Sequence, residues 1–458
     1  MKNFKKVALA AACTALLGGA MTTANAANWL MLQGTEKDGA APRAKVWGFI
    51  QPEYMSTSGT TIKAGPWTGQ KAIFNQIRPD LDTSEDMNVL RARLGVRGTG
   101  LPLDSNVNYF LLAEYGNNGA TRRGGQAVRL TDASVTFNHL PGARVRIGKF
   151  KTPGSEEGLQ AIHVFDYANF SNVTNGLLLE RFFKYDGSGT NVLPGPTFIN
   201  SGQVNAPLSG VGAFRDTGIQ VFDTFKKGNW EHSYAVMYGN GTGANDSDND
   251  ENKDTYMYWS SERVYGGKGP RRQGLKLFAW SQSGKRGLTT EGGDADGTND
   301  VTADFKRDRS GFGATFRKDK YRAAFEYIQA DGMIFAGSDG GAVPGTSSNN
   351  NLTVSSWNME SKGEADGYYA HFGYQVTPKW ELDLRYDVYN RMTDVAAKER
   401  QFVTTTLGAQ YSFNKKSRLI LNYELRSAEA PNLASTHNAN LILGGMDDRF
   451  TAQVLVIF

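Results

Sequence analysis

A period-two alternation of polar and apolar residues, repeated along most of the chain, constrains the fold more than any other feature. It is clearest in the stretch LRARLGVRG (90–98), where Arg91, Arg93 and Arg97 fall on one face and apolar residues such as Leu90 on the other. Successive side chains of a strand point to opposite faces, so this stretch predicts a strand with a cationic face and an apolar face. The apolar face could be the core of a soluble sandwich, or it could contact lipid while the arginines line a wet interior.

Segments of this kind recur about sixteen times, each about ten residues long, which is typical of the strands of a transmembrane barrel. We expect strands at 45–55, 90–98, 107–115, 127–137, 144–149, 215–224, 230–238, 256–264, 274–280, 311–317, 321–329, 367–376, 380–389, 403–413, 418–426 and 450–458.

The connections between these segments alternate in length. Short ones rich in Gly, Pro and Asn lie at 140–143, 226–229, 318–320, 377–379 and 414–417, and long polar ones at 240–254, 281–306, 331–366 and 427–447. Short periplasmic turns and long external loops are the pattern of outer-membrane barrels. No mature segment approaches the roughly eighteen apolar residues of a membrane-spanning helix. The fold class predicted is therefore all-β, a transmembrane antiparallel β-barrel of about sixteen strands.

The two ends of the chain agree with an exported membrane protein. Residues 1–26 combine three early lysines, an apolar run at 7–20 and the small-residue pair Ala24 and Ala26, which predicts a signal peptide cleaved after Ala26. Residues 27–458 would then form the barrel. At the other end the alternating strand FTAQVLVIF finishes on Phe458. It resembles the assembly signal of bacterial outer-membrane barrels, although a last core strand would also alternate.

Composition excludes several classes of function. The one cysteine, Cys13, lies in the predicted signal peptide, so a mature chain has no disulfide, thiolate metal site or haem attachment. Loss of the three leader lysines takes the formal net charge from +4 to +1, which gives no case for nucleic-acid binding.

Three stretches resemble one family in order and spacing. VLRARLGVRG (89–98), VRIGKFKTP (145–153) and FRDTGIQV (214–221) are similar to elements of the phosphate-selective porin O and P family. The resemblance implies a sixteen-stranded outer-membrane channel, commonly a trimer, in which arginines and loop lysines guide anions. It also implies that the long third loop, 152–213, folds into the pore. This chain departs from the family where Gly154 follows Pro153 and in the acidic character of that loop.

The predicted register and the resemblance together give candidate site residues. Pore-lining candidates are Arg91, Arg93, Arg97, Arg144, Arg146, Glu114, Asp132, Arg317, Arg322 and Glu326. Constriction-loop candidates are Glu156, Glu157, Asp166, Glu180, Arg181 and Lys184, a set in which acids outnumber bases and would oppose phosphate. The function expected is passive diffusion of small hydrophilic solutes through a water-filled channel, with a modest preference for anions. The expected partners are these solutes, membrane lipid, lipopolysaccharide and two further copies of the chain, with no cofactor and no metal.

Two other functions stay open on the sequence. One is a barrel that sheathes an electron conduit, whose haems a cytochrome partner would supply. The other is an outer-membrane barrel enzyme, although none of the five histidines lies in a local catalytic pattern and His371 is better explained as a polar lumen residue. The acidic stretch 246–254 lacks the glycine and the final glutamate of a calcium loop, with Glu251 and Met257 at those positions.

Overall fold

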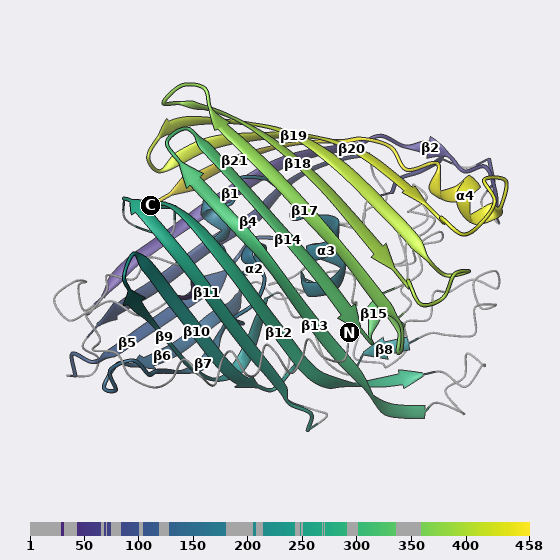
Figure 1. Ribbon diagram of the computed structural model, residues 1–458. Helices are drawn as coiled ribbons and strands as arrows, with labels where there is room; N and C mark the ends of the chain where they lie inside the picture. Colours follow the sequence, from purple (N-terminus) through teal and green to yellow (C-terminus); the bar gives the residue numbers. More distant parts are fainter. Residues whose placement is uncertain are drawn as a thin grey trace.

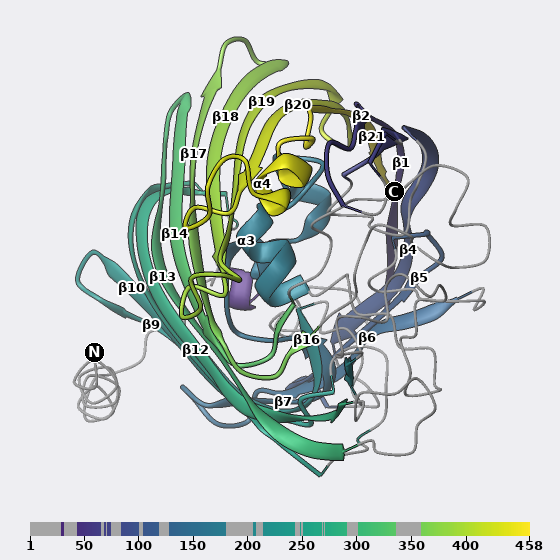
Figure 2. The same ribbon diagram turned by 90° about the vertical axis from the view of Figure 1, so that its right-hand side faces the viewer.

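A closed antiparallel barrel dominates the computed structural model, shown from the side in Figure 1 and turned by 90° in Figure 2. The structure describes residues 29–31, 44–65, 68–69, 71–74, 84–99, 104–118, 128–179, 205–207, 214–242, 248, 251–267, 269, 271–290, 301–335 and 359–458. Within these residues sixteen strands pair in sequence order, and β1 closes the ring by pairing with both β4 and β21. The all-β barrel predicted from the alternation is confirmed.

The strands of the barrel wall are β1 (Lys45–Thr57), β4 (Glu85–Thr99), β5 (Val107–Glu114), β6 (Arg129–Phe137), β7 (Arg144–Lys151), β9 (Arg215–Lys227), β10 (Trp230–Gly239), β11 (Asp254–Gly266), β12 (Gln273–Thr290), β13 (Val301–Lys318), β14 (Tyr321–Asp331), β17 (Glu364–Gln375), β18 (Trp380–Arg391), β19 (Arg400–Asn414), β20 (Ser417–Glu429) and β21 (Arg449–Ile457). The smaller elements are η1 (Trp29–Met31), β2 (Thr60–Thr61), β3 (Lys71–Ala72), α2 (Glu156–Leu159), η2 (Ile162–Val164), α3 (Asn172–Thr174), η3 (Asn175–Leu179), β8 (Asn205–Pro207), β15 (Ile334–Phe335), β16 (Met359–Glu360) and α4 (Asn438–Leu443). No helix among these elements has the length and apolar character needed to cross a membrane.

The wall has an apolar outer surface and a polar, buried inner surface. On β5, Asn108 and Glu114 are fully buried, whereas the intervening Leu111 is 44% exposed. The same arrangement, which is the reverse of that in a soluble protein, continues around the barrel, with exposed apolar residues such as Ile147 and Leu382 on the outside. An outward apolar band around a polar interior is the arrangement that lipid requires.

The prediction of a long connection at 281–306 is wrong for much of this range. Strand β12 continues to Thr290 and β13 begins at Val301, and the ladder between them runs unbroken from Ser281↔Ser310 to Thr290↔Val301. This extension is rich in Gly, Lys, Arg and Thr, so it lacks the apolar alternation used to predict strands. Backbone pairing needs no apolar outer face where a strand pair lies beyond the lipid, which explains why the pattern failed there.

Leu90, expected on the lipid face, is buried inside. The ladder between β1 and β4 shifts register here, because Gln51 pairs with Arg91 and Pro52 pairs with Val89. Leu90 is the extra residue at this bulge and is 3% exposed, while Val89 is 48% exposed. A bulge re-aims side chains, and a proline without an N–H is tolerated beside one.

The two end strands of the barrel join through a close approach. Phe458 and Gly48 exchange backbone hydrogen bonds, with N···O distances of 3.0 Å and 3.2 Å. A Cβ atom at Gly48 would lie 2.5 Å from the Phe458 ring, so only glycine leaves room for the aromatic side chain.

We therefore predict that Gly48→Val lowers the fraction of folded barrel, because overpacking at this seam costs about 1–3 kcal/mol and an open edge leaves backbone groups unpaired in lipid. The measurement is the heat-modifiable mobility of purified protein in gels. The control is Gly266→Val at the end of β11, where an added Cβ meets open space. Equal folded fractions of both variants would contradict the role given to the seam.

Candidate functional site

The chain after β7 turns into the lumen, and we call its described part, 152–179, the inner loop. Figure 2 shows α3 inside the ring of strands, and Figure 1 shows α2 and α3 behind the wall. Most of the inner loop is buried, including Glu156, Glu157 and Asp166. Its contacts with the wall decide the shape and the charge of the interior.

Glu326 on β14 holds the start of the inner loop. Its carboxylate accepts hydrogen bonds from the Ser155 hydroxyl at 2.9 Å and from the backbone N–H of Glu156 at 3.2 Å. It also accepts from two wall side chains, the Trp280 indole and the Tyr369 hydroxyl, both at 2.8 Å. Glu326 is fully buried, and four donors provide the compensation that a buried carboxylate needs.

The two glutamates of α2 are matched by bases on the wall. Glu156 forms an ion pair with Lys276 on β12 and accepts a hydrogen bond from the Trp29 indole at 2.9 Å. Glu157 lies 3.3 Å from a guanidinium nitrogen of Arg385 on β18. Each pair joins the loop to a different strand.

Asp166 has the densest set of cationic neighbours. It forms an ion pair with Arg271, lies 3.2 Å from Arg322 and lies 3.9 Å from Arg418. Arg322 also pairs with Asp383, so guanidinium and carboxylate groups alternate through this cluster. The nearby His163 adds no positive charge near neutral pH, because burial, with Lys151 and Arg418 in the vicinity, lowers its pKa to about 4.

The acids of the inner loop are thus neutralised by the wall. The expectation that they oppose anions has to be revised for Glu156, Glu157 and Asp166, since each is paired with at least one Lys or Arg. The other three constriction-loop candidates, Glu180, Arg181 and Lys184, lie outside the described residues.

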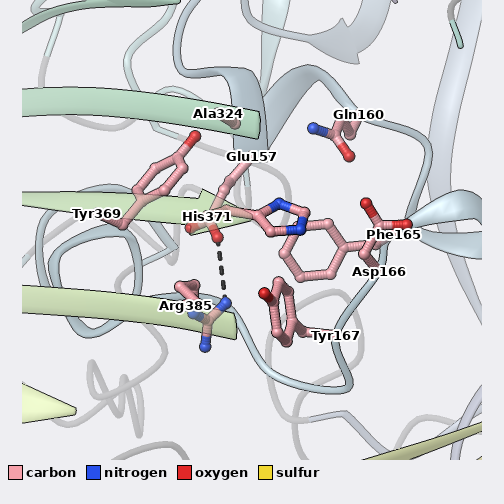
Figure 3. A pocket seen from close by; sticks show the side chains of 9 residues that line it. All are labelled: Glu157, Gln160, Phe165, Asp166, Tyr167, Ala324, Tyr369, His371 and Arg385. Atoms are coloured by element: carbon pink, nitrogen blue, oxygen red, sulfur yellow. Dashed lines mark hydrogen bonds and ion pairs between the residues drawn. The ribbon is translucent and has the colours of Figure 1, made fainter. Parts of the chain in front are cut away.

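A small pocket lies between the inner loop and the wall (Figure 3). The Arg385 guanidinium lies 4.4 Å from the centre of the Tyr167 ring, and the His371 ring meets the same ring edge-on at 5.0 Å. His371 also lies 3.5 Å from Asp383. The residues that line the pocket are Glu157, Gln160, Phe165, Asp166, Tyr167, Ala324, Tyr369, His371 and Arg385, a set without a Ser or Cys nucleophile beside the histidine.

On the part of the wall formed by strands β4 to β9, most of the predicted pore-lining charges form ion pairs between strands. Arg93 on β4 lies 2.7 Å from Glu114 on β5, and Asp132 on β6 lies 3.1 Å from Arg215 on β9. Arg144 on β7 lies 3.1 Å from Asp223 on β9. The four predicted residues among them, Arg93, Glu114, Asp132 and Arg144, lie on the inner face. The pairs join β4 to β5, β7 to β9 and, across the intervening β7, β6 to β9.

Other arginines on the inner wall contact aromatic rings or an amide group. Arg146 packs 4.4 Å from the centre of the Phe222 ring, and Arg97 lies 5.9 Å from that of Phe110. Arg91 donates to the amide oxygen of Gln51 at 3.2 Å. Among the described residues no carboxylate lies within 4 Å of either Arg91 or Arg317, so neither forms a close ion pair. Glu114 and Glu53 attract Arg91 from a greater distance, and Asp383 attracts Arg317.

Sequence reasoning missed several bases that contact the inner loop. Lys276 and Arg385 share the inward face of their strands with Trp280 and Asp383, so a strict period-two count would have found both. Arg271 lies in the turn before β12 and Trp29 in a three-residue helix, where no periodicity marks the side that faces inward.

We predict that Glu326→Ala frees the start of the inner loop, because the donors left unpaired destabilise it by a few kcal/mol, on the order of one to three for each group. Hydrogen exchange followed by mass spectrometry should show faster exchange of amides in 155–179. Glu429→Ala, at the exposed end of β20, is the control and should leave them unchanged. Unaltered exchange in the Glu326 variant would contradict the anchoring role.

Comparison with known proteins gives the family context. Residues 71–192 match the family described as "Phosphate-selective porin O and P", which confirms the resemblance for that part of the chain. The anion-selective porin from Comamonas acidovorans covers 91% of this chain with 99% of its own, at 13% identity and a TM-score of 0.50. A loop-deletion mutant of the outer-membrane protein OmpT of Vibrio cholerae has the same coverage, at 11% identity and a TM-score of 0.50.

No curated protein sequence matches the chain. At these identities the two structures establish the fold alone. The chain therefore has the fold of an outer-membrane porin and, over residues 71–192, matches the phosphate-selective porin O and P family, and both findings indicate the bacterial outer membrane.

Proposed function

We propose that the protein is an outer-membrane porin through which small hydrophilic solutes diffuse passively, with a modest preference for anions. The family match over 71–192 is the observation that best supports the porin function, because that stretch includes the arginine-rich strand β4 and the whole inner loop. A charged inner wall inside an apolar outer belt supports the same conclusion, since a channel wall has to be wetted.

The charge balance of the lumen supports the anion preference. The acids on the inner loop are matched by wall bases, whereas Arg91 and Arg317 form no ion pair within 4 Å among the described residues. Unmatched positive charge between low-dielectric walls attracts anions and raises their local concentration. The ion pairs contribute a local electric field but little net charge. We therefore expect a modest preference for anions and no specific selection of phosphate.

Two further properties belong to the proposal. The family resemblance supports a homotrimer in the outer membrane, in contact with lipid and lipopolysaccharide. The lysine-rich start, apolar run and Ala24–Asn25–Ala26 site support export through a signal peptide that is cleaved after Ala26. The intact mass of purified protein tests the cleavage, and chemical cross-linking in native membranes tests the trimer.

We predict that the double variant Arg91→Gln and Arg317→Gln lowers the ratio of anion to cation permeability, because it removes two positive charges that form no close ion pair. Reversal potentials in asymmetric potassium chloride across a planar bilayer measure that ratio. The fall should be clear near 0.1 M salt and largely gone near 1 M, where the screening length drops from about 10 Å to about 3 Å.

The matched control is Arg263→Gln, which makes the same change on an exposed residue of β11. A preference that stays constant in the double variant would refute the role of these arginines. Wild-type protein that inserts as a folded barrel but passes no current would refute the channel itself.

A further inference from the structure

The start of the described chain lies inside the barrel. In η1, Trp29, Leu30 and Met31 are 7%, 4% and 3% exposed. Figure 2 shows this short purple segment within the ring of strands, beside α3. The three residues belong to a buried apolar cluster that includes Leu159, Val173 and Leu177 of the inner loop, among residues from several wall strands.

One hydrogen bond orients the Trp29 side chain within this apolar cluster. The Trp29 indole N–H donates to Oε1 of Glu156 at 2.9 Å, while Oε2 of the same carboxylate pairs with Lys276. Lys276 therefore fixes the carboxylate to the wall and leaves its other oxygen for an N–H donor. An apolar surface with one oriented acceptor is the usual form of a site for an aromatic ring that carries an N–H group.

We propose that this site is a ligand-binding site in the lumen and that the chain's own residues Trp29–Met31 are its ligand. The inference rests on the proposed channel function. With its ligand bound, the inner loop is packed from the lumen side and the passage beside it is narrower. Without it, the Glu156 oxygen and the apolar surface are open to water and to solutes of the same chemistry, which are aromatic molecules with an N–H donor.

The length of the connection fits an intramolecular ligand. Fourteen residue steps separate Met31 from Lys45 at the start of β1, and a chain of that length can span up to about 46–50 Å. A segment joined to the barrel by a chain of that length is held near its site at a local concentration of about millimolar, so even a weakly binding segment occupies the site most of the time. The predicted cleavage after Ala26 leaves only two residues before Trp29.

The test uses the mature chain lacking residues 27–31. We expect its single-channel conductance in a planar bilayer to rise by about twofold, because the passage beside the inner loop is wider. The synthetic peptide Ala-Asn-Trp-Leu-Met, added to this variant, should return the conductance to that of the wild type. The same peptide with Phe for Trp should need a roughly tenfold higher concentration, because it leaves the Glu156 oxygen without its donor.

The controls separate a ligand site from a merely structural contact. Trp380→Ala removes an exposed tryptophan of the outer face and should leave conductance unchanged. If the deletion variant does not show the heat-modifiable mobility of a folded barrel, the variant Trp29→Phe is used in its place. Its open-channel current should be noisier than that of the wild type, and the added peptide should reduce this noise. A folded variant with wild-type conductance and no response to the peptide overturns this inference. A wild-type barrel that does not conduct overturns the proposed function instead.

Discussion

The interior of this barrel depends on one constraint, which is that a polar or charged group buried away from water needs a partner. A wall that presents apolar residues to lipid has to turn its polar residues inward, and here they face a loop as well as solvent. Glu326 shows the constraint most clearly, because its fully buried carboxylate accepts from Ser155, Glu156, Trp280 and Tyr369. The same bonds that solvate the carboxylate hold the inner loop in place. Removing one partner from such a group destabilises the fold, so the inner loop and the wall depend on each other for their stability.

The pairing also decides what electrostatic field a solute meets. Charged residues are abundant on the inner surface, but most of them are matched across strands, as Arg93 is with Glu114, or between wall and loop, as Arg385 is with Glu157. Counting charges in the loop sequence alone missed the neutralisation of Glu156, Glu157 and Asp166, because their basic partners lie more than a hundred residues away along the chain. We propose that the net effect on ions comes from the minority of groups that form no close ion pair, such as Arg91 and Arg317 among the described residues.

Period-two alternation was sufficient for the barrel, for most strand positions and for the side on which residues such as Arg146, Asp132 and Glu326 lie. The alternation failed to predict structure where something other than an apolar face determined it. The ends of β12 and β13 are paired by backbone bonds without an apolar face, and Leu90 is turned inward by a bulge that no local pattern marks. The site was harder to predict, since the contacts of Trp29 and Arg271 join irregular segments to distant parts of the chain. Such contacts depend on tertiary packing and leave no periodic signal.

The three guanidinium groups around Asp166 have a consequence for how this family can diverge. Arg271, Arg322 and Arg418 come from a turn and two strands far apart in sequence, yet they share one carboxylate. A relative that replaces the aspartate with a neutral residue would leave three like charges with only Asp383 and Glu381, both paired with Arg322, as acidic neighbours, and it would be disfavoured until a wall arginine changed too. Substitutions at these positions should therefore occur together across related sequences, so that selectivity evolves by exchange of matched sets of residues rather than by single changes.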